Sequence, residues 1–129
     1  MVCLETDFLV ALMRKRPDAE RKFLELERKQ DLLQVTPISA AELFHGAFKS
    51  KNAGGVEKSE SVLSLLEFLQ FDFLSARHCG ETMALLDRKG HVGDLDELTG
   101  SICVRYGQTL LTRNVKHFSK IKGLKIESW

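Results

Sequence analysis

Two kinds of hydrophobic pattern alternate along the chain. Longer segments place apolar residues at helical spacing and charged residues on the remaining positions, which is typical of surface helices packed on a core. Short apolar runs without polar alternation are typical of strands buried on both faces of a parallel sheet. These runs are Met1–Leu4, Leu32–Val35, Phe71–Leu74, Thr109–Leu111 and Leu124–Ile126. Strands that alternate with helices in this way predict an α/β fold with a mainly parallel central sheet.

Capping and breaking residues suggest where the predicted helices begin and end. Asp7 or Thr6 is expected to cap the first helix, and Pro17 occupies the first turn of the second. Ser39 is expected to cap the third helix, which places Glu42 at the capping-box position. The expected helices are Phe8–Met13, Glu20–Lys29, Ala40–Phe48, Val56–Leu69, Ser75–Lys89, Asp94–Arg105 and Val115–Phe118. Glycine-rich loops are expected at 49–55 and 90–93.

Composition narrows the class of protein. The 129 residues suit one domain, 1–129, with a substantial core. A net charge of +1 argues against a protein that coats nucleic acid generally, so any contact with nucleic acid has to be local. Cys3, Cys79 and Cys103 form no CxxC pair and lie in apolar surroundings, which predicts buried reduced thiols and a cytoplasmic location. The chain shows neither a signal-peptide pattern nor the roughly 20 apolar residues of a membrane span.

Acidic and polar residues occur where separate strands are predicted to end. In parallel α/β sheets, ligands bind in the crevice outside the carboxyl ends of the strands. We therefore expect these residues to share one acidic pocket, and Mg²⁺ or Mn²⁺ prefers such oxygen ligands. The acidic residues are Glu5, Asp7, Glu42, Asp94 and Asp96, and the polar ones after the fourth strand are Thr112 and Asn114.

Each of these residues also has a purely structural interpretation. Glu42 alone is consistent with a capping-box acid. Asp94 and Asp96 alone are consistent with acids that the helix dipole favours in a first turn. Asn114 alone is typical of a turn or a cap. Their order along the chain, each at a strand end, favours a metal site.

Four segments resemble the PIN domains, and among them the VapC-like toxin ribonucleases, over nearly the whole chain. They are LETDFLV, SAAELFHGA, GDLDELTGSI and LLTRNVKHFSKIKGLKIESW. The resemblance implies a three-layer α/β/α fold with a central, mainly parallel sheet of about five strands. It also implies Mg²⁺- or Mn²⁺-dependent endonucleolytic cleavage of single-stranded RNA, often tRNA or another structured RNA.

Matched position by position, the resemblance assigns roles to individual residues. The metal-binding and catalytic acids are Glu5, Glu42 and Asp96, with Asn114 at the family's fourth polar position. Thr112 is implied to position water or substrate, and Asp94 is a second-tier metal ligand.

The first acidic position departs from the family, which has aspartate where this chain has Glu5. Asp7 stands where the family has a small hydroxyl or amide residue. Residues two apart on an extended strand end point the same way, so Asp7 is placed to supply the shorter carboxylate. It is equally placed to act only as a helix cap.

The resemblance further implies a homodimer and a small VapB-like antitoxin as partners. Basic side chains flank the acidic segments and either form a rim for RNA phosphates or are ordinary solvated charges. They are Arg14, Lys15, Arg16, Lys49, Lys51, Arg113, Lys116 and Lys120.

The four histidines, His45, His78, His91 and His117, are expected to be surface or packing residues. Two functions are compatible with these features: a metal-dependent endoribonuclease toxin, or a catalytically weak PIN module that binds RNA or a protein.

Overall fold

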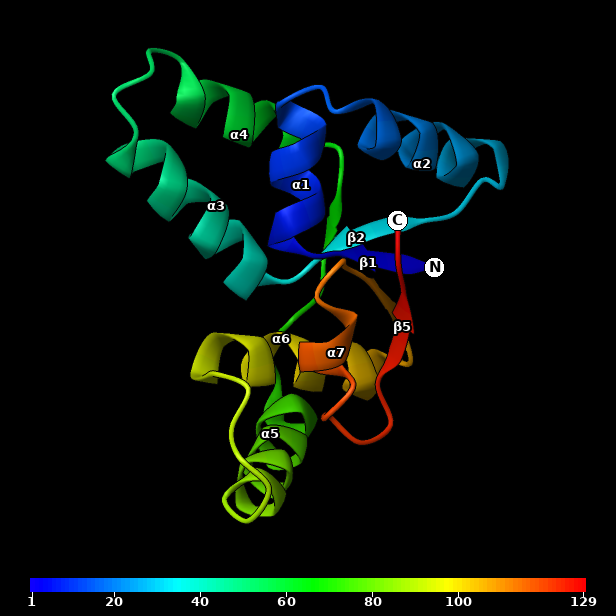
Figure 1. Cartoon of the computed structure of the whole chain (residues 1–129), viewed down its shortest axis with the longest axis vertical. Helices are drawn as coiled ribbons and strands as arrows, with labels where there is room; N and C mark the ends of the chain where they lie inside the picture. Colours follow the sequence, from blue (N-terminus) through cyan, green and yellow to red (C-terminus); the bar gives the residue numbers. More distant parts are fainter.

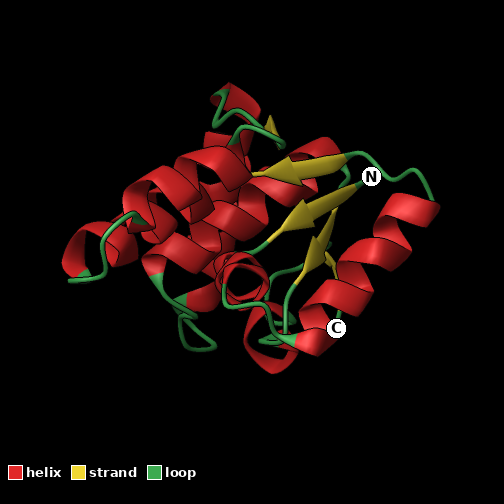
Figure 2. Ribbon diagram, turned by 90° about the horizontal axis from the view of Figure 1, so that it is seen from above, coloured by secondary structure: helices red, strands yellow, loops and turns green.

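The computed structural model describes residues 1–129 and has a five-stranded sheet with helices on both faces (Figures 1 and 2). All neighbouring strands are parallel, and their order is β3-β2-β1-β4-β5. The strands are β1 (Val2–Leu4), β2 (Leu33–Val35), β3 (Glu67–Phe68), β4 (Thr109–Leu111) and β5 (Lys125–Glu127). This arrangement confirms the predicted three-layer α/β/α fold with a parallel sheet of about five strands.

The helices form two layers, with α1 to α4 on one side of the sheet and α5 to α7 on the other (Figure 1). The first layer consists of α1 (Thr6–Met13), α2 (Pro17–Arg28), α3 (Pro37–Lys49) and α4 (Gly55–Leu63). The second consists of α5 (Phe73–Leu86), α6 (Asp94–Tyr106) and α7 (Val115–Phe118). None of these helices combines the length and the apolar character that crossing a membrane requires.

The central strands separate two hydrophobic cores. Successive residues of a strand point to opposite faces of the sheet. Val2 and Leu4 of β1 therefore pack in the core that also contains Phe8, whereas Cys3 packs in the core that contains Ile102. Burial on both faces explains why β1 is apolar at every position. The three cysteines are buried and unpaired, as predicted.

The capping residues of α1 and α3 differ from the predicted ones, and both helices begin earlier. Glu5, rather than Asp7 or Thr6, caps α1, because its side chain accepts a hydrogen bond from the Asp7 amide at 3.1 Å. Thr36, rather than Ser39, caps α3, and Pro37 begins that helix. This start places Ser39 at the third helical position, where a capping-box acid would lie, so Glu42 is not a capping residue.

The third strand is not where the apolar pattern placed it. The predictions of a helix extending to Leu69 and of a strand over Phe71–Leu74 are both wrong. Helix α4 ends at Leu63, and β3 pairs with β2, where the Leu69 amide donates to the Val35 carbonyl at 2.9 Å. The segment 65–74 is apolar at most positions. Its pattern therefore contains no period that could distinguish a helix from an edge strand.

We predict that Phe8→Ala lowers the free energy of unfolding by about 3–5 kcal/mol, because it removes a fully buried ring from the core. That ring also packs edge-on against Trp129, with centroids 5.2 Å apart. Urea denaturation at one fixed protein concentration measures the change. Phe48→Ala is the matched control, since Phe48 is 73 % exposed, and it should change stability by no more than about 0.5 kcal/mol. Equal losses in the two variants would contradict the assignment of Phe8 to the core.

Candidate metal centre

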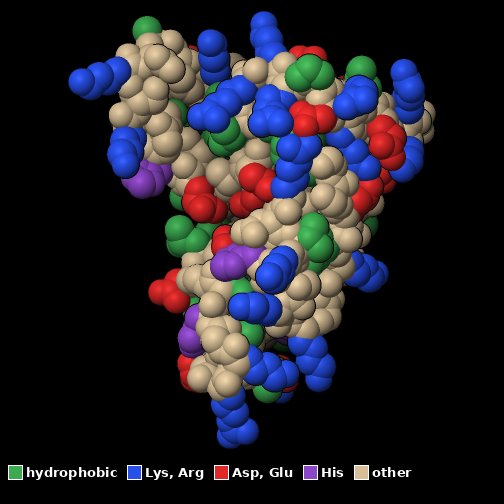
Figure 3. Space-filling view, in the orientation of Figure 1, with side chains coloured by type: hydrophobic (Ala, Val, Ile, Leu, Met, Phe, Trp, Pro, Cys, Tyr) green, Lys and Arg blue, Asp and Glu red, His purple; other side chains and the backbone are tan.

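Three carboxylates meet at the carboxyl edge of the sheet. Glu5 directly follows β1, Glu42 lies on α3 and Asp96 lies in the first turn of α6. One carboxylate oxygen of each lies within 4.8 Å of the others. Acidic side chains also gather at the middle of the molecule in Figure 3, between two parts rich in Lys and Arg. The strand ends coincide because β1 pairs in parallel register with both β2 and β4. The positions of the three residues in the sequence predicted this convergence.

Glu5 is the most buried member of the group, with 7 % of its surface exposed. Its Oε2 atom accepts the Asp7 amide at 3.1 Å and lies 3.5 Å from the Thr112 hydroxyl. Burial, followed by the neighbouring Asp7 carboxylate, raises the pKa of Glu5 to about 8. Glu5 therefore holds a proton at neutral pH unless a cation takes its place.

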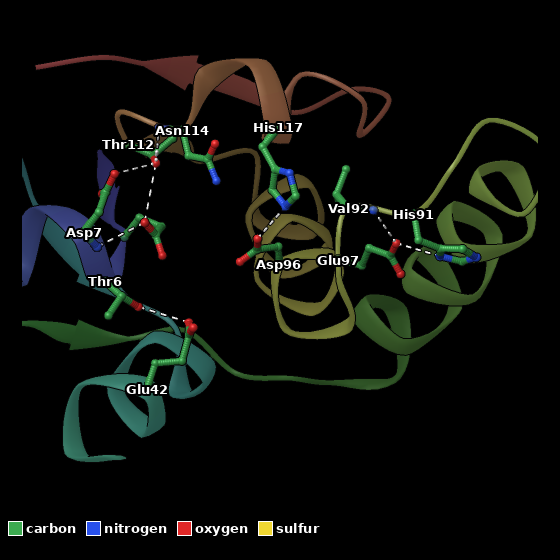
Figure 4. Close-up of polar contacts among 11 residues, drawn as sticks. Thr6, Asp7, Glu42, His91, Val92, Asp96, Glu97, Thr112, Asn114 and His117 are labelled. Carbon is green, nitrogen blue, oxygen red and sulfur yellow. Dashed lines mark hydrogen bonds and ion pairs between the residues drawn. The ribbon is translucent and has the colours of Figure 1, made fainter. Parts of the chain in front are cut away.

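Glu42 and Asp96 are half-buried and each has one polar partner (Figure 4). The Thr6 hydroxyl donates to Glu42 Oε1 at 3.1 Å, and His117 Nε2 lies 2.8 Å from Asp96 Oδ2. Burial raises the pKa of Glu42, against the Thr6 hydrogen bond and with a contribution from the charge of Asp96. Burial also raises the pKa of Asp96, although the charge of His117 opposes it.

These properties fit a divalent cation. Three hard oxygen donors converge from separate elements, and all three have raised pKa values chiefly because burial disfavours their charged forms. Glu5, Glu42 and Asp96 are therefore the residues that would hold Mg²⁺ or Mn²⁺.

Asp7 and Asp94, the other two acids proposed as ligands, are not brought into this group. Asp7 Oδ2 accepts the Arg113 amide at 2.8 Å and the Thr112 hydroxyl at 3.1 Å, which turns the carboxylate toward the loop after β4. Asp94 is exposed at the start of α6. Asp7 thus does not cap α1; its carboxylate lies beside that of Glu5 and anchors the β4–α7 loop.

Thr112 and Asn114 occupy that loop. Thr112 is fully buried, and its hydroxyl also accepts the Asn114 amide at 3.0 Å. Asn114 is the residue before α7 and is exposed, and its side-chain amide lies between Thr112 and His117 in the view of Figure 4. Thr112 is therefore placed to orient the acids, whereas the Asn114 side chain makes no hydrogen bond within the chain and faces solvent.

The expectation that His117 is only a surface or packing residue is wrong, because it contacts Asp96 directly. The short helix α7 brings it there. His117 follows Asn114 by three residues, a spacing that places both on one side of a helical turn. That spacing is the one signal in the sequence that could have linked His117 to the site.

A second buried acid, Glu97, supports the helix that carries Asp96. Its Oε1 atom accepts the Val92 amide at 3.2 Å and contacts His91 Nδ1 at 2.8 Å (Figure 4). The hydrogen bonds to Glu97 and Asp87 raise the pKa of His91. Glu97 thereby ties the turn before α6 to the first turn of that helix. This role was not predicted from the sequence, because nothing in the local pattern around Glu97 indicates burial.

Comparison with known proteins gives concordant results. The model of the PIN domain family matches residues 2–124. The chain is 34 % identical over 128 residues to a protein named Ribonuclease VapC2 from Rickettsia felis, with 98 % of this chain and 96 % of that protein aligned. It is 30 % identical, with the same coverage, to a protein named tRNA(fMet)-specific endonuclease VapC from Salmonella typhimurium.

Solved structures agree with these sequence matches. The crystal structure of VapBC2 from Rickettsia felis, bound to a DNA fragment from its promoter, contains a chain that superposes with a TM-score of 0.89. That chain is 33 % identical, with 100 % of this chain and 99 % of that chain covered. A chain of the DNA-bound VapBC from Salmonella typhimurium superposes with a TM-score of 0.85 at 28 % identity, with 99 % and 97 % covered.

We predict that, without divalent cations, the free energy of unfolding falls as the pH rises from about 4.5 to about 8. In that window the folded chain keeps the proton on Glu5 that the unfolded chain releases. Urea denaturation in EDTA at several pH values measures the slope, and Glu5→Gln should flatten it. Saturating Mn²⁺ should restore stability most strongly at the upper end. Glu20→Gln, at an exposed position, is the control and should leave the slope of unfolding free energy against pH unchanged. If Glu5→Gln also left this slope unchanged, the raised pKa of Glu5 would be contradicted.

Proposed function

The chain belongs to the PIN-domain family, and we propose that it is a metal-dependent endoribonuclease that acts as the toxin of a toxin–antitoxin pair. The observation that carries this proposal is the convergence of Glu5, Glu42 and Asp96, with oxygens within 4.8 Å of one another. Two relatives that are named as nucleases and align with nearly the whole chain support it. We treat residues 1–129 as a single PIN domain.

The proposed reaction is hydrolysis of a phosphodiester bond. A bound Mg²⁺ or Mn²⁺ supplies polarisation of the phosphoryl oxygen and a lowered pKa of a bound water. Glu5, Glu42 and Asp96 would hold the cation, and His117, which contacts Asp96 Oδ2, would orient that ligand. Thr112 orders Glu5 and Asp7, while Asn114 faces the solvent from which substrate enters. All three cysteines are buried, so none is placed to attack the substrate, and the proposed hydrolysis uses water as the nucleophile without a covalent intermediate.

The substrate that we propose is single-stranded RNA, in tRNA or another structured RNA, in the cytoplasm. One relative bears the name of a tRNA(fMet)-specific endonuclease, which supports this class. We further propose a VapB-like antitoxin and a second copy of the chain as protein partners. Structural neighbours that were solved as VapBC pairs support the antitoxin. The largely exposed side chains Phe48, Leu65 and Phe73 offer apolar area to protein partners.

A second candidate function is a catalytically weak PIN module that binds RNA or a protein. The observation that favours it is Glu5, because glutamate places its carboxylate roughly 1 Å farther from the backbone than the family's aspartate, and such a displacement costs about a hundredfold in rate. Mapping the cut ends of total RNA, with and without Mn²⁺, distinguishes cleavage from binding alone.

Loss of a metal-binding carboxylate should abolish cleavage. We predict that Asp96→Asn and Glu42→Gln each lower the rate by about a hundredfold or more, because the cation loses a ligand. Asp94→Asn is the matched control and should have a small effect, since Asp94 lies exposed outside the group. Circular dichroism confirms that each variant is folded, and calorimetric titration with Mn²⁺ should show weaker binding only in the first two. Cleavage by folded Asp96→Asn at the unmodified rate would remove Asp96 from the site.

The length of the first carboxylate gives a separate prediction. Glu5→Asp should raise the cleavage rate in saturating Mn²⁺, because it shortens an overlong ligand. Glu5→Gln should abolish cleavage, whereas Asp7→Asn should change it little, since an amide oxygen still accepts the Thr112 hydroxyl and the Arg113 amide. If Asp7→Asn were the damaging change and Glu5→Gln nearly silent, Asp7 would be the ligand instead.

A further inference from the structure

A pocket with three arginines opens directly beside the acidic group. It has a volume of about 520 Å³ and lies between α1 and the β4–α7 loop. Glu5 and Asp7 are among the residues that line it. The cationic lining consists of Arg14, Arg16 and Arg113. Lys and Arg side chains gather over α1, α2 and α4 in Figure 3, next to the acidic side chains at the middle of the molecule. The pocket thus joins an acidic end to a basic one.

Arg113 is held in place from several sides. Its Nε atom donates to the Trp129 carbonyl at 2.9 Å, and its guanidinium carbon lies 3.8 Å from the centre of the Trp129 ring. Its terminal nitrogen pairs with Asp18, and its backbone amide is bound by Asp7. A guanidinium that is ordered before a ligand arrives loses little conformational entropy on binding.

Arg14 and Arg16 face the same pocket from the turn between α1 and α2. Arg14 makes no ion pair, and Arg16 reaches only Asp18, at 3.4 Å. Arg16 and Arg113 thus pair with the same carboxylate, that of Asp18. The three arginines carry three positive charges, and this one paired acid carries one negative charge. Lys15, between them, has a left-handed backbone with φ of 55° and lines a different pocket. The turn therefore directs Arg14 and Arg16 to the arginine pocket and Lys15 to another. Lys15 carries the same charge, so it can serve as a control.

We propose that this arginine pocket binds a backbone phosphate of single-stranded RNA adjacent to the phosphate that is cleaved. The inference rests on the proposed function, since a strand whose scissile phosphate lies at Glu5 and Asp96 must continue along the surface. Asp7 and Arg14 are separated by seven residues of α1, about 10 Å along the helix. The backbone of Arg14 is therefore displaced along α1 from the acids, which places its guanidinium for a neighbouring phosphate of the strand. Their fork of donors matches the oxygens of a phosphate.

A second pocket borders the acidic group on the other side of α1, between α3 and α4. It has a volume of about 270 Å³, and its cationic side chains are Arg14 and Lys58. We assign the strand to the arginine pocket because it has three guanidinium groups against one in the second pocket, and because Arg113 is already ordered. Substitution of Lys58 then tests whether the strand passes through the second pocket instead.

The test measures binding of a fluorescent single-stranded RNA of mixed sequence to the full chain carrying Asp96→Asn, which prevents cleavage. Anisotropy gives the Kd between about 50 and 200 mM KCl, a range in which binding to phosphates weakens steeply. Arg14→Gln and Arg16→Gln should each weaken binding about 3- to 10-fold at low salt. Their double variant should lower the slope of log Kd against log salt by about 0.7 for each phosphate that the protein no longer neutralises. Lys15→Gln and Lys58→Gln are the controls and should leave both quantities unchanged.

The outcomes separate this inference from the function on which it rests. If Lys15→Gln weakens binding as much as the arginine variants, or if the arginine variants bind like the parent, the pocket is not a phosphate site. If Lys58→Gln weakens binding and Arg16→Gln does not, the strand follows the second pocket and the inference is wrong. In those cases the unmodified chain still cleaves RNA in Mn²⁺. If it neither cleaves nor binds the RNA, the proposed function fails and the inference fails with it.

Discussion

Carboxylate groups whose oxygens lie within 4.8 Å of one another repel, and partial burial of Glu5, Glu42 and Asp96 removes much of the water that would weaken the repulsion. The fold keeps them together nonetheless. Glu5 is anchored by β1, a strand paired on both sides and buried on both faces. Asp96 is anchored by α6, which packs closely on Ile121 because Gly100 has no side chain; a Cβ atom there would lie 2.4 Å from Ile121. Packing energy thus maintains a charged arrangement that a proton or a cation then relieves.

The polar groups around the acids orient them for one shared centre. The Oδ2 atom of Asp96 contacts His117, and Oε1 of Glu42 accepts the Thr6 hydroxyl. Glu5 is held by the backbone at the start of α1 and by Thr112. These partners come from α7, from α1 and from the end of β4, which are separate in sequence. Partners of this kind determine the direction of a metal ligand and are as necessary to a site as the ligands themselves.

Helix α1 links the chemistry of the site to the surface that surrounds it. Acids stand at its N-terminal end and Arg14 stands at its C-terminal cap, the arrangement that the helix dipole favours. The net charge of the chain is only +1. Even so, its acidic group and its arginine pocket lie a short distance apart, at the two ends of α1. The separation allows one surface to bind a cation and a polyanion together, provided that each contact remains local.

The sequence by itself determined the alternation of strands and helices, the bounds of β4 and α7, and the three acids that converge. Hydrophobic periodicity is a local property, and parallel pairing necessarily brings the carboxyl ends of the strands to one edge. It could not place β3, because an edge strand in a segment that is apolar at most positions is located by pairing with β2 and not by its own pattern. Nor could it show that Asp7 binds the β4–α7 loop, that His117 contacts Asp96, or that Trp129 orders Arg113. Those contacts join residues distant in the chain, so only the packing of the helices and the sheet decides them.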